Sequence, residues 1–419
     1  MPVPHAVTPL RRNRDFMVLW TGHAISALGS SIAMIAYPLL ALLATGSART
    51  AGLIAFVGMA AGAVLRLPAG VFVDRLPRRA LLVTCDAIRA VTTASVALAV
   101  VTGRLSMAHL VVAAVVNAAC DAFFDPAQMV TVRQVVPTAQ LPNAMAQNEA
   151  RGHLAALGGP PLGGLLFGVA AALPIAAQAA SFVTSGLLIG SIRQKLHGGQ
   201  GQRANLRPLR HDLLTGIRVV WANTFLRVTL LSAAGYSFIF PAVVLVVIAS
   251  TRARGAPAAE IGAALSLAGV GGILGAWLSP QLQRRLPPPV LVYLFCTTTT
   301  LALGALTFAY SPFLIGALLA LTYFTSAPAN GMLAAVQISI TQPELQGRVL
   351  SAAMLVAGLA APLGPLAGGW LLQDFGVRAT FVVLTCMSAA LTAVVLLSSA
   401  IRHMRPPSAI DRESHAEGR

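Results

Sequence analysis

Residues 70–79 read Gly70-Val-Phe-Val-Asp74-Arg75-Leu-Pro-Arg78-Arg79, the densest cluster of charge inside an otherwise apolar chain. Predominantly apolar stretches flank this loop on both sides, at residues 51–73 and 80–102. A helix crosses a bilayer with about 20 mostly apolar residues, and each flank reaches that length. The sequence therefore predicts two transmembrane helices joined by a short charged turn at a membrane surface.

The composition supports the same interpretation for the whole chain. Of its 419 residues, 56% are hydrophobic and only 10% are charged, whereas soluble globular domains carry about 25% charged residues. The net charge of +16 does not indicate a nucleic-acid partner, because the basic residues occupy short loops between apolar stretches and not one folded polar face. The chain is therefore predicted to be an all-α integral membrane protein.

The four cysteines lie within apolar stretches and share no metal-ligand or redox spacing. We expect them to be small buried hydrophobic residues, and we expect no metal and no other cofactor. The sequence also contains no nucleotide-binding loop and no Ser/His/Asp constellation. It therefore predicts no enzyme, and any concentrative transport would have to draw on ion gradients.

Twelve stretches of the chain come near the length of a membrane span. They lie roughly at residues 17–44, 51–73, 80–102, 107–130, 151–171, 173–192, 228–250, 261–283, 290–309, 312–333, 349–371 and 380–400. An even number of spans places both termini on one side, and that side carries 22 Lys and Arg residues against five in the alternate loops. The positive-inside rule therefore predicts a multi-pass plasma-membrane protein with both termini in the cytoplasm.

The predicted cytoplasmic loop at residues 193–227 separates two six-helix bundles, residues 1–192 and 228–401, and a disordered tail follows at 402–419. The halves repeat, since residues 159–164 (Gly-Pro-Pro-Leu-Gly-Gly) match Gly-Pro-Leu-Ala-Gly-Gly 205 residues later. A parallel repeat of this kind is a secondary-transporter plan, with the substrate held between the halves. We expect pseudo-symmetric bundles in a monomeric protein.

With these features, the chain resembles the major facilitator superfamily over nearly its whole length. The loop at 70–79 is similar to the signature between the second and third helices of that superfamily, and residues 159–164 are similar to an element associated with its exporters. Four shorter motifs resemble the branch of enterobactin exporters and macrolide-efflux proteins: Asn13-Arg14-Asp15-Phe16, Leu67-Pro68-Ala69-Gly70, Phe124-Asp125-Pro126-Ala127 and Leu141-Pro142-Asn143-Ala144. The resemblance implies small-molecule transport by alternating access.

The charged loop is a candidate gating element, made up of Gly70, Asp74, Arg75, Arg78 and Arg79. Its carboxylate would lie where the loop arginines and a helix N-terminus both favour an anion. The resemblance implies a latch on the cytoplasmic side. The second copy of the loop keeps two arginines and lacks the acid, so such a latch would be stronger in the N-terminal half. The alternative is that the arginines only set the topology.

Charged residues inside the predicted spans form a second group, each costing roughly 2.5–3.5 kcal/mol at mid-bilayer. Asp86 and Arg89 are three residues apart and can pair on one helix face. Arg66 and Asp125 lie at about the same depth. We expect these four residues to form a mutually neutralising structural network.

Asp121 lies nearer the middle of the fourth span and is a candidate proton carrier. It belongs to a polar stripe with Asn117, Asp125 and Gln128, whose spacing keeps one helix face polar. The resemblance implies that helices 1, 4, 7 and 10 line the central cavity. We predict that Asp121, helped by Asp125, exchanges a proton for substrate, and His23 is a third candidate because histidine titrates near neutral pH. The alternative is that Asp121 belongs to the structural network.

Polar and aromatic residues on these four helices are candidates for lining the cavity. They are Ser26, Ser30, Tyr37, Asn117, Tyr236, Phe240, Tyr323 and Asn330. A lining with few fixed charges suits a hydrophobic or amphipathic substrate. Simple helix packing is the alternative explanation of the aromatic residues.

The two repeated glycine-proline motifs are candidate hinges: Gly159, Pro160, Gly163 and Gly164 in one half, and Gly364, Pro365, Gly368 and Gly369 in the other. Proline removes a backbone donor and kinks a helix, and glycine lets a neighbouring helix approach closely. Such segments could bend during rocking, and a packing role overlaps with this interpretation.

Together these features predict a secondary active transporter, namely a proton-coupled antiporter that exports a drug-like, macrolide-like or siderophore-like compound. Its expected partners are the small molecule, protons and the lipid bilayer. The alternatives are a proton symporter or uniporter that imports a nutrient, and a membrane sensor that transports nothing.

Overall fold

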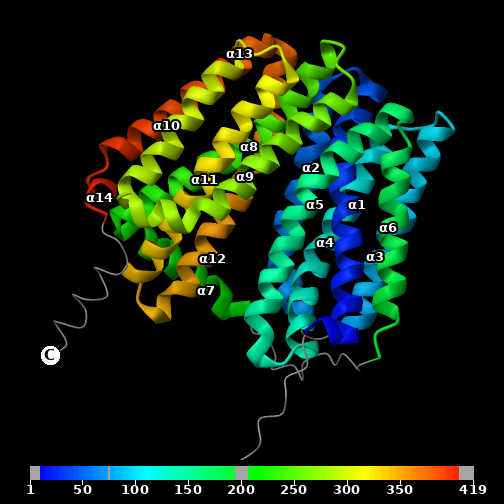
Figure 1. Cartoon of the computed structure of the whole chain (residues 1–419), viewed down its shortest axis with the longest axis horizontal. Coiled ribbons are helices and arrows are strands. Elements are labelled where there is room, and N and C mark those ends of the chain that lie inside the picture. The colour runs from blue at the N-terminus through cyan, green and yellow to red at the C-terminus, as the bar shows by residue number, and fades with distance from the viewer. Residues whose placement is uncertain (1–9, 74–75, 194–205, 405–419) are drawn as a thin grey trace, which may run out of the picture. The chain divides into compact units, whose positions relative to one another are not determined.

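The computed structural model describes residues 10–73, 76–193 and 206–404, and all regular structure within these ranges is helical (Figure 1). Asp74 and Arg75 of the charged loop, and residues 405–419 of the predicted tail, lie outside the described residues. The chain divides into two compact units. Unit 1 comprises Met1–Leu40 and Val57–Ala204, and unit 2 comprises Ala41–Phe56 and Asn205–Arg419.

Six long helices supply the described part of unit 1. They are α1 (Arg14–Thr45), α2 (Ala48–Val73), α3 (Arg78–Val101), α4 (Met107–Val135), α5 (Leu141–Val169) and α6 (Leu173–Gly190). The end of α1 and the start of α2, Ala41–Phe56, belong to unit 2. Within unit 1, α3 packs against both α4 and α6.

Unit 2 continues with eight further helices. They are α7 (Leu206–Ala222), α8 (Thr224–Ala253), α9 (Ala258–Arg285), α10 (Pro288–Leu306), α11 (Pro312–Ile340), α12 (Pro343–Ala360), α13 (Leu363–Leu397) and α14 (Ser399–Arg402). The closest pairings are α9 with α11 and α8 with α13. The segment expected to be a plain central loop thus contains the helix α7.

The predicted all-α membrane protein is confirmed. Ten helical stretches of the described chain are long and apolar enough to cross a membrane. One of them, Pro343–Leu397, is long enough for two spans. The 29-residue helix α5 is long enough for the remaining span but is not among the ten. The described helices are therefore consistent with twelve spans.

Two span boundaries differ from the prediction. The fifth span, expected from residue 151, already begins at Leu141, because hydropathy misses a polar first part that is still helical. The eleventh span is interrupted between α12 and α13, at residues 361–362. The eleventh span ends at Gly376, which has φ of 77° and ψ of 178°. Glycine adopts such a positive φ at little cost.

The glycine-proline motifs allow close helix packing in each unit. A Cβ on Gly159 or Gly163 of α5 would collide with Ser31 or Ile32 of α1. In unit 2, a Cβ on Gly364 of α13 would collide with the backbone oxygen of Phe238 on α8. The motif repeated in the sequence therefore supports the same kind of contact in both units.

Candidate functional site

The most concentrated polar site of unit 1 is centred on Arg89 of α3. Its Nη2 lies 2.5 Å from Oδ1 of Asp86, one helical turn earlier, and its Nη1 lies 2.5 Å from Oδ1 of Asp121 on α4. Asp86 and Arg89 share a face because they are three residues apart. One guanidinium thus bridges two carboxylates and links α3 to α4.

Aromatic rings enclose the same guanidinium. Its Cζ lies 4.4 Å from the ring centroid of Phe124 on α4 and 4.5 Å from that of Phe182 on α6. Cations are attracted to ring faces at such distances. The Arg89 and Asp86 side chains are 3% and 0% exposed, whereas Asp121 is 49% exposed. Arg89 therefore joins one sealed carboxylate to one accessible carboxylate.

Further charged residues surround this trio within unit 1. Arg66 of α2 acts electrostatically on both Asp121 and Asp125. Arg151 of α5 acts on Asp125 and on His23 of α1. The network therefore draws charge from several helices, and Arg151 is a member that sequence reasoning missed.

The structure places the predicted network residues close together but arranges them differently from the expectation. Asp86 and Arg89 pair as predicted. Asp121 is the residue of α4 that contacts the guanidinium, although the network was expected to use Asp125. Asp121 therefore takes part in the network, as the alternative interpretation of this residue expected, and its role as a proton carrier stays a prediction.

The remaining candidates on α1 and α4 lie in the same unit. His23 packs edge-on against Phe124, with ring centroids 5.4 Å apart. The Tyr37 hydroxyl donates to Oε1 of Gln178 at 3.2 Å, and Asn117 donates to its own helix at the Ala113 carbonyl. Ser26 is buried and Ser30 is half-buried.

Two arginines of the charged loop, Arg78 and Arg79, lie in the first turn of α3. Arg78 is buried at the first turn of that helix, and the Arg79 guanidinium donates to the carbonyl oxygen of Gly190 at the end of α6. Asp74 and Arg75 lie outside the described residues, so their latch remains a prediction. Gly70 lies in α2.

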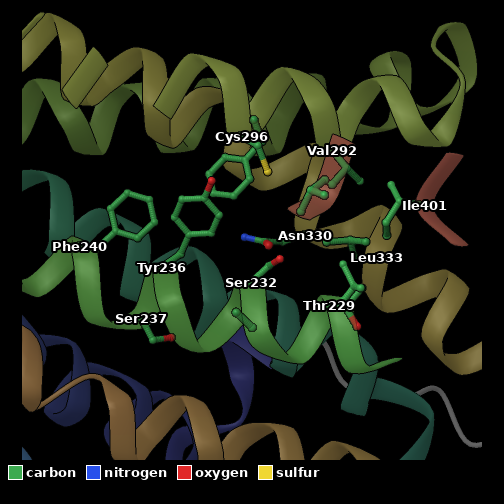
Figure 2. Close-up of a pocket in the computed structure, with 14 residues that line it drawn as sticks. Thr229, Ser232, Tyr236, Ser237, Phe240, Val292, Cys296, Asn330, Leu333 and Ile401 are labelled. Atoms are coloured by element: carbon green, nitrogen blue, oxygen red, sulfur yellow. The ribbon is translucent and has the colours of Figure 1, made fainter. Parts of the chain in front are cut away.

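Unit 2 contains a pocket of about 220 Å³ between α8, α10 and α11 (Figure 2). Three of the predicted cavity residues, Tyr236, Phe240 and Asn330, line it. Tyr323 is not among the lining residues, but its ring lies 5.4 Å from that of Phe240. Phe295 of α10 completes the aromatic wall, 4.8 Å from Tyr236 between ring centroids.

Sequence reasoning missed the contribution of α10 to this pocket. Phe295 and Cys296 lie on the ninth span, which the resemblance does not place among the cavity-lining helices. The available signal was two adjacent apolar residues within an apolar stretch, and that signal is common to any packed helix.

Ionisable residues at the centre of membrane-spanning bundles mark solute or ion pathways. The sequence model of the Major Facilitator Superfamily matches residues 19–326 and 229–418. The chain belongs to that superfamily and is therefore a membrane transport protein and not an enzyme.

Characterised relatives match along almost the full length. The multidrug efflux pump Tap of Mycolicibacterium fortuitum is 27% identical over 413 residues, covering 95% of this chain and 98% of the relative. Macrolide efflux protein A of Streptococcus pyogenes is 22% identical over 397 residues, covering 93% and 97%. These relatives agree with the branch that the sequence motifs indicated.

Solved structures support the fold. A bacterial homologue of the human lysosomal transporter Spinster aligns with a TM-score of 0.70 and 16% identity, covering 94% of this chain and 96% of the other. A bacterial homologue of the iron transporter ferroportin aligns with a TM-score of 0.72 and 15% identity, covering 91% and 98%.

Proposed function

We propose that the protein is a proton-coupled antiporter that exports neutral or amphipathic small molecules from the cytoplasm. The observation that carries the proposal is the bridging of Asp86 and Asp121 by Arg89, with one carboxylate sealed and the other accessible. The names of the relatives, a multidrug efflux pump and a macrolide efflux protein, support the direction and the substrate class.

The bridge suits a proton carrier because its two acids are not equivalent. Asp86 is fully buried against Arg89, so this pair stays intact when conditions outside the bundle change. Asp121 shares the same guanidinium but is half exposed, so a proton can reach it. Its protonation removes the charged contact of Arg89 with α4 and leaves Arg89 held by Asp86 on its own helix.

The charged residues around Asp121 determine how its protonation changes the contacts at this site. Arg66 attracts Asp121 from α2, and Asp125 lies one turn further along α4. When Asp121 is protonated, Arg89 loses its contact with α4 and keeps Asp86, and the attraction between Arg66 and α4 weakens. The proton thus changes which helices are connected, and this is the requirement for coupling proton binding to a conformational change.

The energy available is sufficient for export. A proton that enters down a gradient of one pH unit and a potential of 100 mV releases about 1.4 and 2.3 kcal/mol, respectively. Together these terms support a substrate gradient of roughly 500-fold.

The glycine-proline motifs of α5 and α13 are the proposed hinges, because they lie where each helix touches α1 or α8.

The test is proton flux in proteoliposomes that contain the full chain under an imposed pH gradient. We expect a substrate-dependent flux with the unaltered protein and its loss in Asp121→Asn, which keeps the shape and the acceptor oxygen. Asp125→Asn removes the helping carboxylate but not the one that Arg89 contacts, and we expect it to lower the flux less than Asp121→Asn does. Normal proton flux in Asp121→Asn would show that another group carries the proton.

Direction is tested separately in cells. Deletion of the gene from its host should raise the accumulation of a fluorescent substrate. A fall in accumulation would instead identify an importer.

A further inference from the structure

The pocket of unit 2 is built from two chemically different walls. Phe240, Tyr236 and Phe295 form an aromatic wall, with centroids 4.8 to 6.4 Å apart. Beside this wall, the Asn330 side chain and the Ser232 hydroxyl line the pocket (Figure 2). Val395 and Ile401 border the pocket from the end of α13 and from α14.

Two hydroxyl groups at this pocket, those of Tyr236 and Ser232, make no hydrogen bond of normal geometry to the described residues. The Tyr236 hydroxyl lies near the side chains of Cys296, Ser388 and Thr392. Tyr236 is only 5% exposed. A buried polar group without a partner costs roughly 1–3 kcal/mol, so a ligand that supplies a hydrogen bond here would remove this penalty.

The volume indicates what size of group fits. An apolar cavity of about 150 Å³ accommodates benzene, and this pocket measures about 220 Å³. One ring or two fused rings therefore fill it. The lining contains no Asp, Glu, Lys or Arg, so a neutral group is favoured.

A second cavity of about 160 Å³ shares a wall with the first. Thr229, Ala233, Asn330 and Leu333 line both. A third cavity of about 310 Å³ shares Ala334, Gln337 and Val349 with the second and reaches Thr341 at the end of α11. From Asn330 to Thr341 the helix rises about 16 Å at 1.5 Å per residue. The three spaces therefore follow one side of α11.

We infer that this pocket holds the ring-bearing end of a neutral amphiphile, whose oxygen pairs with Tyr236 and Ser232 and whose remainder follows α11 past Asn330. The inference rests on the proposed export function and specifies its substrate class. It assigns the recognition of the ring to unit 2, on α8, α10 and α11, and leaves proton exchange to the Arg89 site of unit 1.

The test uses the purified full chain in detergent and two probes of one shape, 2-naphthol and naphthalene, which differ only by a hydroxyl group. Binding is measured by calorimetry. We expect the unaltered protein to bind 2-naphthol about five- to tenfold more tightly than naphthalene, the worth of one or two hydrogen bonds. The double variant Tyr236→Phe/Ser232→Ala should lose this preference.

Two further variants complete the design. Tyr323→Phe removes a hydroxyl from the same aromatic cluster but outside the lining, and it should keep the preference. Ala233→Phe adds a ring to the wall between the first two cavities and should lower the affinity for both probes at least tenfold. Thermal unfolding checks that each variant is folded. The near-isosteric changes at Tyr236 and Ser232 preserve the test even when Ala233→Phe does not fold.

Retention of the 2-naphthol preference in the double variant would overturn the inference, and so would the absence of any preference in the unaltered protein. Neither result depends on proton flux. A protein that binds 2-naphthol through Tyr236 but moves no protons would overturn the proposed function and leave the pocket standing. Proton-driven export by a protein that binds 2-naphthol and naphthalene equally would overturn the inference about the pocket and leave the proposed function standing.

Discussion

The two units follow the same plan of spans, yet they bury different kinds of polar group. All four charged side chains that are buried in the described chain, Arg78, Asp86, Arg89 and Arg151, belong to unit 1. The buried polar side chains of unit 2 are serines and threonines. One half of a repeated architecture therefore contains buried charge, and the other contains buried hydroxyl groups.

The difference has an energetic meaning. A buried charge needs a partner of opposite sign on another element, as Arg89 has in Asp121. A buried threonine can donate to a carbonyl of its own helix, as Thr299 does to Phe295. Many hydroxyl groups of unit 2 can therefore be satisfied within one helix, whereas the buried charges of unit 1 depend on partners of opposite sign. On the functions proposed above, charge serves proton exchange in unit 1, and its absence suits neutral ligands in unit 2.

The largest effect is expected from removing the central cation of unit 1. Arg89→Leu leaves Asp86 buried without its partner, and breaking a buried ion pair in this way costs about 3–5 kcal/mol. We expect a marked fall in the free energy of unfolding, measured in detergent by thermal or denaturant unfolding.

The control for this change removes both charges. The double variant Asp86→Leu/Arg89→Leu contains no sealed carboxylate, and we expect it to recover much of the lost stability. If the single variant were as stable as the unaltered protein, the Asp86–Arg89 pair would not stabilise unit 1.

An intermediate effect is expected from the hydroxyl cluster of unit 2. Thr300 of α10 hydrogen-bonds the hydroxyls of Ser388 and Thr392 on α13, at 2.8 and 2.9 Å. Thr300→Val keeps the shape and removes these bonds, which should cost about 1–2 kcal/mol. Thr297→Val on the same helix is the control, because that hydroxyl bonds only to carbonyls of its own helix. An equal loss in both variants would mean that the contact between the helices contributes nothing.

Local chemistry explains which features could be predicted from the sequence. Span positions follow from hydropathy, and the Asp86–Arg89 pair follows from helical spacing. The interruption at residues 361–362 was missed because hydropathy is continuous there, although Pro362, which cannot donate a backbone hydrogen bond, is a local signal for it. The early start of α5 was missed for the opposite reason, since a polar segment can still be helical.

Contacts between distant parts of the chain could not be predicted in the same way. Asp121 and Asp125 lie on one face of α4, and no local rule decides which of them meets Arg89, 32 residues away from Asp121. The pocket needed α10, and its Phe295 is distinguished from other apolar residues only by its neighbours in space. These contacts are decided by tertiary packing, which depends on many residues of the sequence at once.

The smallest effect is expected from the exposed ion pair of unit 2. Arg49 donates to both oxygens of Asp374, at 2.7 and 2.8 Å, and lies 4.4 Å from the ring centroid of Trp370. Both charged side chains are more than 40% exposed. Water already solvates them well, so the pair should contribute only about 0.2–1 kcal/mol.

Asp374→Asn tests this estimate against Arg89→Leu, since the two changes remove comparable ion pairs in different surroundings. We expect a small loss of unfolding free energy that shrinks further as salt is added, because exposed charges are screened. The effect of Arg89→Leu should change less with salt, since the Arg89 and Asp86 side chains are buried. A loss at Asp374 as large as that at Arg89 would show that burial does not distinguish the two units.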